Sequence, residues 1–187
     1  VTYSHDHTLI RHAYYVRTAS GEEASYVDGV GTNGATAHIA PLQGFFVRTR
    51  ATGTYITIPL NAREHNAAPR FKSADQISLV RLALSSAAAR DEMVIRFEPE
   101  ATFSFDGLLD AGKPFSHQTG QLKIYSLMKG EDYSINTIPW PSTKTRIPLV
   151  LHTPEAGTYN ITRSQLQNTG ETGIFLTDHL TGSSIDL

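Results

Sequence analysis

The sequence predicts an all-β fold, an antiparallel β-sandwich of the jelly-roll or immunoglobulin-like type with little helix. Three observations predict it. Apolar and polar residues alternate over short stretches, which is the pattern of half-buried strands. These stretches are rich in β-branched and aromatic residues. Clusters of Gly, Pro and Asn separate them at intervals of roughly 8–12 residues, the spacing expected of a sandwich or a barrel.

The alternation is clearest in two stretches. Within residues 91–98, Met93, Ile95 and Phe97 fall on one face of the expected strand, and mostly charged residues fall on the other. Residues 77–84 alternate in the same way. The other expected strands are residues 54–58, 122–127, 133–138, 146–151, 157–162 and 173–177.

Little of the chain is left for helix. Residues 164–167, with Ser164 as N-cap, and residues 106–111 are each expected to form one helical turn. Residues 83–90 have helical propensity but lie between two expected strands, so we interpret them as a loop. The glycine-rich residues 29–34 are interpreted as a hairpin loop.

The length fits one domain. A chain of 187 residues buries about 70% of its unfolded surface, so it folds without disulfides, in keeping with the absence of Cys. We expect a single sandwich module over residues 1–187. Within it, a smaller N-terminal lobe at residues 1–65 would meet a main sandwich at residues 70–187, with the seam at residues 62–69.

Charge and hydropathy exclude several kinds of partner. The 16 Lys and Arg and 18 Asp and Glu residues are interspersed and leave a formal charge of −2, so nucleic acid is not expected as a partner. The apolar runs are only a few residues long, so no membrane span is expected. The chain starts at Val1 without an initiator Met or a visible signal peptide, and we interpret it as a mature or excised piece.

Catalytic motifs are missing from the sequence, so we expect a protein that is not an enzyme. There is no G-x-S-x-G elbow for a nucleophilic serine. The glycine-rich residues 29–34 precede no helix, so they lack the context of a phosphate-binding loop. A pair of carboxylates for glycoside hydrolysis cannot be argued from sequence, because 18 acidic residues place some pairs close in any fold.

Two clusters raise the question of a metal. His5 and His7 would share one face of a strand, with His12 nearby, but the segment lies at a chain end and no HExxH motif follows it. Asp106 and Asp110 flank a glycine-containing turn and are the candidate ligands for Ca²⁺, which takes oxygen ligands from loops.

The aspartates also have a structural interpretation. Asp106 would cap its own turn and Asp110 would pair with Lys113. Both interpretations stay open at this point.

Aromatic residues suggest a binding surface. Trp140 lies between two prolines, and with Tyr125 or Tyr26 it could form a stacking platform for a sugar ring. The alternative is that Trp140 closes one end of the sandwich core.

Ten segments of the sequence carry more information together than alone. They are IAPLQGFFV at 39–47, IPLNAREH at 58–65, RLAL at 81–84, DEMVIRF at 91–97, FDGLLDAGK at 105–113, IYSL at 124–127, YSIN at 133–136, IPL at 147–149, AGTYNIT at 156–162 and LTDHLTG at 176–182. Taken together, these segments resemble a β-sandwich module of large secreted and surface proteins of Bacteroidota. They keep the order of that module, and the resemblance covers roughly residues 26–187.

Modules of this kind typically precede the C-terminal sorting domain of the type IX secretion system. The resemblance therefore implies a secreted or outer-cell-surface location and an accessory role without catalytic residues. The family's usual strands before residue 1 and after residue 187 are missing. Two interpretations stay open: the sandwich is incomplete by itself and a strand from a partner subunit could fill the vacancy, or the chain is one segment of a longer polypeptide.

The leading functional hypothesis is a non-catalytic extracellular structural or assembly module, a type IX secretion cargo, whose partners are other domains or subunits of a surface assembly. The alternative is a carbohydrate-binding or adhesive module that uses Trp140, Tyr125 and Tyr26 to bind a glycan. No cofactor is expected other than the candidate Ca²⁺ at Asp106 and Asp110.

Overall fold

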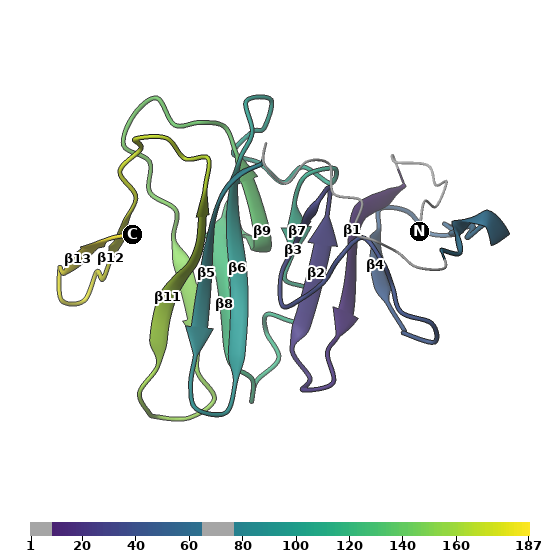
Figure 1. Cartoon of the computed structure of the whole chain (residues 1–187), viewed down its shortest axis with the longest axis horizontal. Coiled ribbons are helices and arrows are strands. Elements are labelled where there is room, and N and C mark those ends of the chain that lie inside the picture. The colour runs from purple at the N-terminus through teal and green to yellow at the C-terminus, as the bar shows by residue number, and fades with distance from the viewer. Residues whose placement is uncertain (1–8, 65–76) are drawn as a thin grey trace.

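Two packed β-sheets and a small projecting hairpin make up the molecule (Figure 1). The computed structural model describes residues 9–64 and 77–187. It confirms the predicted all-β class, since one 3₁₀ turn, η1 (Leu60–Ala62), is the only helix in the described ranges. No helix among these residues is long and apolar enough to cross a membrane.

The first sheet has four strands in the order β3-β2-β1-β4. Their bounds are β1 Ile10–Arg17, β2 Glu23–Val27, β3 Val30–Gly31 and β4 Phe46–Thr49. All neighbours in this sheet are antiparallel. The whole sheet comes from the segment in which the smaller N-terminal lobe was expected.

The second sheet has seven strands, in the order β10-β8-β9-β6-β5-β11 with the short β7 beside β9. The bounds are β5 Ser78–Ser85, β6 Arg90–Phe97, β7 Ala111–Gly112, β8 Lys123–Met128, β9 Glu131–Ile138, β10 Leu149–His152 and β11 Asn160–Gln167. Its neighbours are antiparallel except β6 and β9, which run parallel. A separate hairpin of β12 (Phe175–Thr177) and β13 (Ser184–Asp186) follows.

The seven-stranded sheet has a core on each face. One face carries Met93, Ile95 and Phe97 of β6 among other buried aliphatic residues, as the alternation predicts. The other face packs against the four-stranded sheet, where Val94 of β6 meets Tyr15 of β1. Both faces of β6 are therefore buried. One face lies against the core formed within the seven-stranded sheet itself, and the other lies against the four-stranded sheet.

Some predicted elements are wrong. Residues 164–167 do not form a helical turn, because β11 runs through them and pairs with β5 around a bulge between Arg163 and Gln165. Residues 54–58 contain only an isolated bridge at Thr57 instead of a strand. By contrast, residues 106–111 do contain the single turn expected of them, since the backbone N–H groups of Leu109 and Asp110 donate to the carbonyl of Asp106 before β7 begins at Ala111.

Candidate functional site

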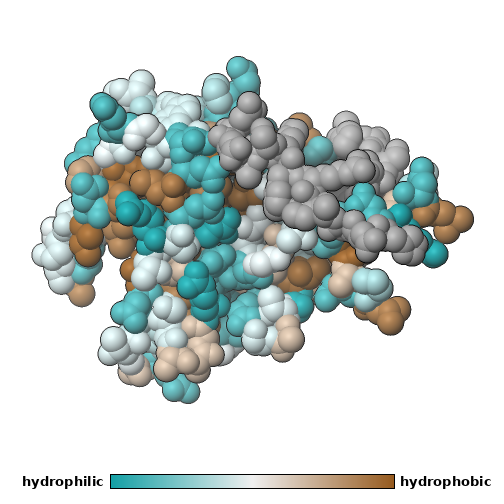
Figure 2. Space-filling model, in the orientation of Figure 1, coloured by the Kyte–Doolittle hydropathy of each residue, from teal (hydrophilic) through white to brown (hydrophobic). Residues whose placement is uncertain are grey.

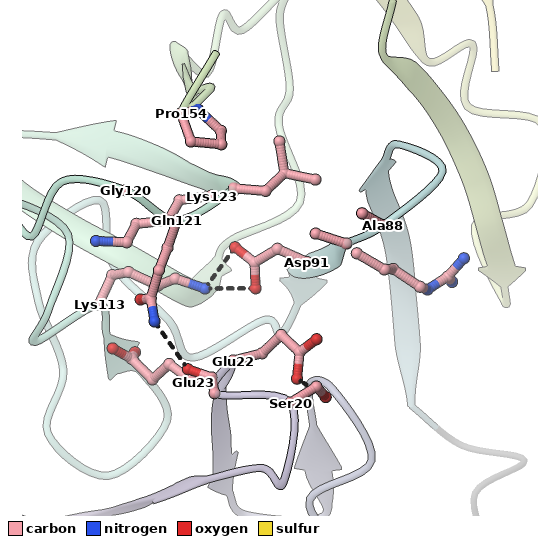
Figure 3. A pocket seen from close by; sticks show the side chains of 14 residues that line it. Ser20, Glu22, Glu23, Ala88, Asp91, Lys113, Gly120, Gln121, Lys123 and Pro154 are labelled. Atoms are coloured by element: carbon pink, nitrogen blue, oxygen red, sulfur yellow. Dashed lines mark hydrogen bonds and ion pairs between the residues drawn. The ribbon is translucent and has the colours of Figure 1, made fainter.

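The most unusual polar feature is a buried ion pair between Asp91 and Lys113. Lys113 Nζ lies 2.8 Å from both Asp91 Oδ1 and Oδ2. The two side chains are only 1% and 2% exposed. Figure 3 shows the Lys113 amine pointing directly at the carboxylate. A buried charge is tolerated only when it is paired and hydrogen-bonded, so this contact holds both residues in place.

Three elements converge on the pair. Asp91 lies at the start of β6, and Lys113 directly follows β7, where its backbone N–H donates to the carbonyl of Asp132 at 2.9 Å. Ile124 of β8 donates its backbone N–H to Asp91 Oδ2 at 2.8 Å. The pair thus joins strands that are separate in the sequence.

Asn33 completes the shell around Asp91. Its side-chain Nδ2 donates to Asp91 Oδ1 and to the backbone carbonyl of Glu23, both at 2.6 Å. The residue has a left-handed backbone, with φ of 50°, which asparagine tolerates better than most residues. The turn after β3 therefore aims an amide at the carboxylate, which accepts hydrogen bonds on both oxygens.

Glu23 of β2 is a second buried carboxylate at the same place. It is 6% exposed. One oxygen accepts the backbone N–H of Phe115 at 3.2 Å, while Oε1 has no hydrogen-bond partner. Burial raises the pKa of Glu23 above its ordinary value, and the positive charge of Lys113 partly opposes the rise. Glu23 is therefore an acid that holds its proton more readily than an exposed glutamate.

These groups line one cavity of about 160 Å³. Its walls include Glu22, Glu23, Asp91, Lys113 and Gln121 (Figure 3). The cavity is large enough for a few water molecules and far smaller than the pockets of drug-sized ligands. Its chemistry is that of an amine, a carboxylate and a second acid held together away from bulk solvent.

The loop beside the cavity is held by a buried lysine. Lys123 of β8 donates from Nζ to the carbonyls of Phe115, Ser116 and Gln118. Burial lowers the pKa of Lys123, and the charge of Glu23 opposes this. Lys123 fixes the chain that leads away from Lys113.

The predicted calcium ligands belong to a different network. Asp106 caps its turn by accepting the N–H of Leu108 at 2.8 Å. Asp110 accepts the N–H of Asp106 at 2.7 Å and that of Thr137 at 2.6 Å, which ties the turn to β9. The expected pairing of Asp110 with Lys113 is wrong, because Lys113 is bound to Asp91.

No group of three or more His, Cys, Asp or Glu side chains within residues 9–64 and 77–187 could hold a metal ion. The Ca²⁺ hypothesis at Asp106 and Asp110 therefore stays a prediction, with no third His, Cys, Asp or Glu side chain to join them among these residues. His5 and His7 lie outside the described residues, and His12 lies on β1.

The structure separates the three aromatic residues of the proposed sugar platform. Trp140 stacks on Phe97 with ring centroids 4.5 Å apart and packs against the core of the seven-stranded sheet. Tyr125 is buried in β8, and Tyr26 lies in the other sheet beside Tyr14. The arrangement supports the core-packing interpretation of Trp140. The glycan platform stays a prediction.

Sequence reasoning did not single out Asp91, Lys113, Glu23 or Asn33 as a site. One signal was available. Asp91 lies two residues before Met93 and four before Ile95, so all three side chains point to the same face of the strand. The alternation therefore places a carboxylate on the core face, where it requires a cation.

Comparison with known proteins adds a family and no activity. The chain matches the model of DUF8693, a domain of unknown function, over residues 3–187. Neither a curated protein nor a solved structure matches it. Because the match covers nearly its entire length, the chain belongs to the DUF8693 family.

Proposed function

We propose that this domain is a non-catalytic structural module that assembles end to end with further copies of the same chain. The observation that carries the proposal is the exposure of large apolar side chains at both ends of the long axis. Figure 2 shows hydrophobic residues reaching the surface at both of these ends. Exposed apolar surface on a folded domain commonly marks an interaction site.

The C-terminal end is the β12–β13 hairpin. Phe175, Leu180 and Ile185 are exposed there, Leu180 to 93%. The two strands pair only with each other, and the hairpin projects from the seven-stranded sheet (Figure 1). A two-stranded hairpin is marginally stable alone in water, so a partner that covers its apolar side chains would stabilise it.

The opposite end is the segment around β4 and η1. Leu42, Tyr55 and Leu60 are exposed there, and Leu42 has no protection from solvent. Leu42 and Tyr55 lie in the loops on either side of β4, and Leu60 is the first residue of η1.

The two ends carry opposite charge, which favours a second copy as the partner. Residues 168–187 contain three acidic residues and no Lys or Arg. Residues 36–64 contain three arginines and one glutamate. A contact between unlike ends of one chain is heterologous, and it produces rows or filaments when it does not close into a ring.

The polar groups of the cavity support a structural role. Asp91 accepts hydrogen bonds on both oxygens, and Lys123 is occupied by three carbonyls. The hydrogen bonds that these groups make therefore hold strands and loops together.

Light scattering over a concentration series tests the assembly. We expect oligomers that grow with concentration and weaken with added salt. The hairpin variant Phe175→Ser/Ile185→Ser and the opposite-end variant Leu42→Ser/Leu60→Ser should each remain monomeric. Leu127→Ser, at an exposed leucine of β8 away from both ends, is the matched control and should assemble as the wild type does.

Mixing the two end variants identifies the mode of contact. Each retains one intact end, so the mixture should form dimers and nothing larger. A wild-type protein that stays monomeric at all concentrations would contradict assembly. A hairpin-to-hairpin dimer, unaffected by Leu42→Ser/Leu60→Ser, would contradict the end-to-end arrangement.

For location, we propose the extracellular space or outer cell surface, as a cargo of type IX secretion. The support is the ordered set of segments that resemble modules of such cargo proteins, such as residues 39–47 and 105–113. Antibodies against the domain should label intact cells or the medium of the source organism. Labelling that persists unchanged after loss of the secretion machinery would contradict the proposal.

A further inference from the structure

We propose that Lys113 and Asp91 condense into an intramolecular amide bond, a covalent cross-link between β6 and the loop that follows β7. The proposal rests on the geometry of the buried pair and does not depend on end-to-end assembly. It assigns the site a self-modification, and it makes the module mechanically harder to open.

Proximity is the first argument. Nζ is equidistant, at 2.8 Å, from both oxygens of Asp91. The carbon that carries these oxygens then lies about 3 Å from the nitrogen, the separation of a near-attack arrangement. Both side chains are held by the fold, so the entropy of bringing an amine to a carboxyl group has already been lost on folding.

Exclusion of water is the second argument. Amide formation from an amine and an acid releases water, and hydrolysis opposes it where water is abundant. Lys113 and Asp91 are almost fully buried, and the cavity of about 160 Å³ that they line holds only a few water molecules. The reacting forms are the neutral amine and the neutral acid, and transfer of one proton from Nζ to the carboxylate across the 2.8 Å contact produces both.

Stabilisation of the intermediate is the third argument. Attack of Nζ on Cγ places negative charge on a carboxyl oxygen of Asp91. The backbone N–H of Ile124 donates to Oδ2, and the Asn33 amide donates to Oδ1. Fixed donors on the reacting oxygens are the arrangement that stabilises tetrahedral intermediates of acyl transfer.

The step balances without a further reactant. The bond from Nζ to Cγ forms and the bond from Cγ to Oδ1 breaks. Oδ1 leaves as water with protons that come from Nζ and from the carboxyl group, and Oδ2 becomes the amide oxygen. Lys–NH₂ and HOOC–Asp give Lys–NH–CO–Asp and one H₂O, with no oxidant or reductant.

Glu23 is placed to relay protons through the cavity, as a positioning residue that does not contact the reacting atoms. Its Oε1 is buried and without a hydrogen-bond partner, and it lines the same cavity as Asp91 and Lys113. General acid–base assistance contributes a factor of about a hundred or more to such steps. We therefore expect Glu23→Gln to form the bond at least about a hundredfold more slowly.

Cyanogen bromide provides the test, because the chain has only two methionines, Met93 and Met128. Cleavage after them separates Asp91 from Lys113 and yields the fragments 1–93, 94–128 and 129–187. With the amide bond in place, fragments 1–93 and 94–128 should stay joined on a denaturing gel. The intact protein should also be about 18 Da lighter than its sequence, the mass of the water released on condensation.

A mass that is lower by one water molecule would not by itself establish the amide bond. Asp28-Gly29 and Asp106-Gly107 are sequences that can lose water by closing a succinimide, and this leaves all three fragments separate. Lys113→Arg, which keeps the positive charge and adds no cleavage site, should abolish the joined fragment, whereas Lys129→Arg, at an exposed lysine, should retain it.

If Lys113→Arg fails to fold, the fragment pattern of the wild-type protein still tests the proposal. Three separate fragments from folded wild-type protein, with the full sequence mass, would overturn the proposal. For Glu23→Gln, the linked fraction is followed over time and pH. If the rate of bond formation and its pH profile are the same as in the wild type, Glu23 takes no part in the reaction.

Discussion

Asp110 should make the stability of this domain depend on pH in the opposite direction from an ordinary salt-bridged aspartate. Burial raises the pKa of Asp110 from 3.8 to about 7, although the backbone N–H groups of Asp106 and Thr137 oppose the rise. The folded state therefore holds this proton more tightly than the unfolded state. Its contribution to stability is fully present below about pH 4 and is lost as the pH rises through about 7.

The size of the effect follows from the two pKa values. A tenfold change in an ionisation constant corresponds to about 1.4 kcal/mol, so the rise to about 7 is worth at most about 4 kcal/mol. Asp110→Asn carries no titratable proton and removes this dependence. We expect the free energy of unfolding of the wild type, relative to Asp110→Asn, to fall by up to about 4 kcal/mol between pH 4 and pH 8.

Urea unfolding measures the difference. The single Trp140 stacks on Phe97 in the core, so its fluorescence reports loss of packing. Asp186→Asn, at an exposed carboxylate of β13, is the matched control and should follow the wild type at every pH. A difference between wild type and Asp110→Asn that stays constant from pH 4 to pH 8 would refute the reasoning.

Three further changes test the packing around the two cores. Trp140→Ala removes a ring stacked on the core and should lower the free energy of unfolding by about 3 kcal/mol, measured by urea unfolding followed by far-ultraviolet circular dichroism. Gly31→Ala places a Cβ 1.9 Å from the backbone oxygen of Ala35, so the loop must move and we expect a loss of about 3 kcal/mol by thermal unfolding. Tyr15→Phe removes the hydroxyl that accepts the buried N–H of Gly112 at 3.0 Å, and it should cost about 1–3 kcal/mol in the same assay. A loss below about 0.5 kcal/mol, the usual size of an unremarkable surface change, would count against the contact tested.

The central strands could be predicted from the sequence because alternation is strong there. Residues 77–84 and 91–98 correspond to β5 and β6 within one residue at each end. One face of each strand carries three consecutive large apolar side chains, Val80, Leu82 and Leu84 in β5 and Met93, Ile95 and Phe97 in β6, and such a run makes the alternation easy to recognise.

The edges could not be predicted in the same way. β11 is mostly polar and exposed, and it forms a strand because β5 offers it backbone partners across a bulge. Ser164 in that bulge resembles a helix N-cap when only the local sequence is considered. Tertiary pairing decided this element, and local propensity did not.

The candidate site was beyond sequence reasoning for a related cause. Asp91, Lys113 and Asn33 come from three separate parts of the chain, and only the sheet order brings them together. The prediction that Asp110 pairs with Lys113, three residues later, was wrong. The Asp110 carboxylate accepts hydrogen bonds from backbone N–H groups, and Lys113 pairs with Asp91 instead.

The polar face of β6 shows why this sandwich has one register. Sequence alternation places Glu92 and Arg96 opposite the hydrophobic face, where solvent would be expected. The structure instead covers that face with the four-stranded sheet, so the charges find partners across the two sheets: Arg96 lies 3.1 Å from Asp28 of the β2–β3 turn, and Glu92 accepts the backbone N–H of Asn33 at 3.1 Å. Sliding the sheets past each other would break both contacts, whereas the Arg81–Glu92 pair joins β5 to β6 within one sheet and would be kept. The apolar contacts between the sheets would tolerate a slip better than these directional polar contacts, so we infer that the polar contacts set the register and the apolar residues supply most of the stability.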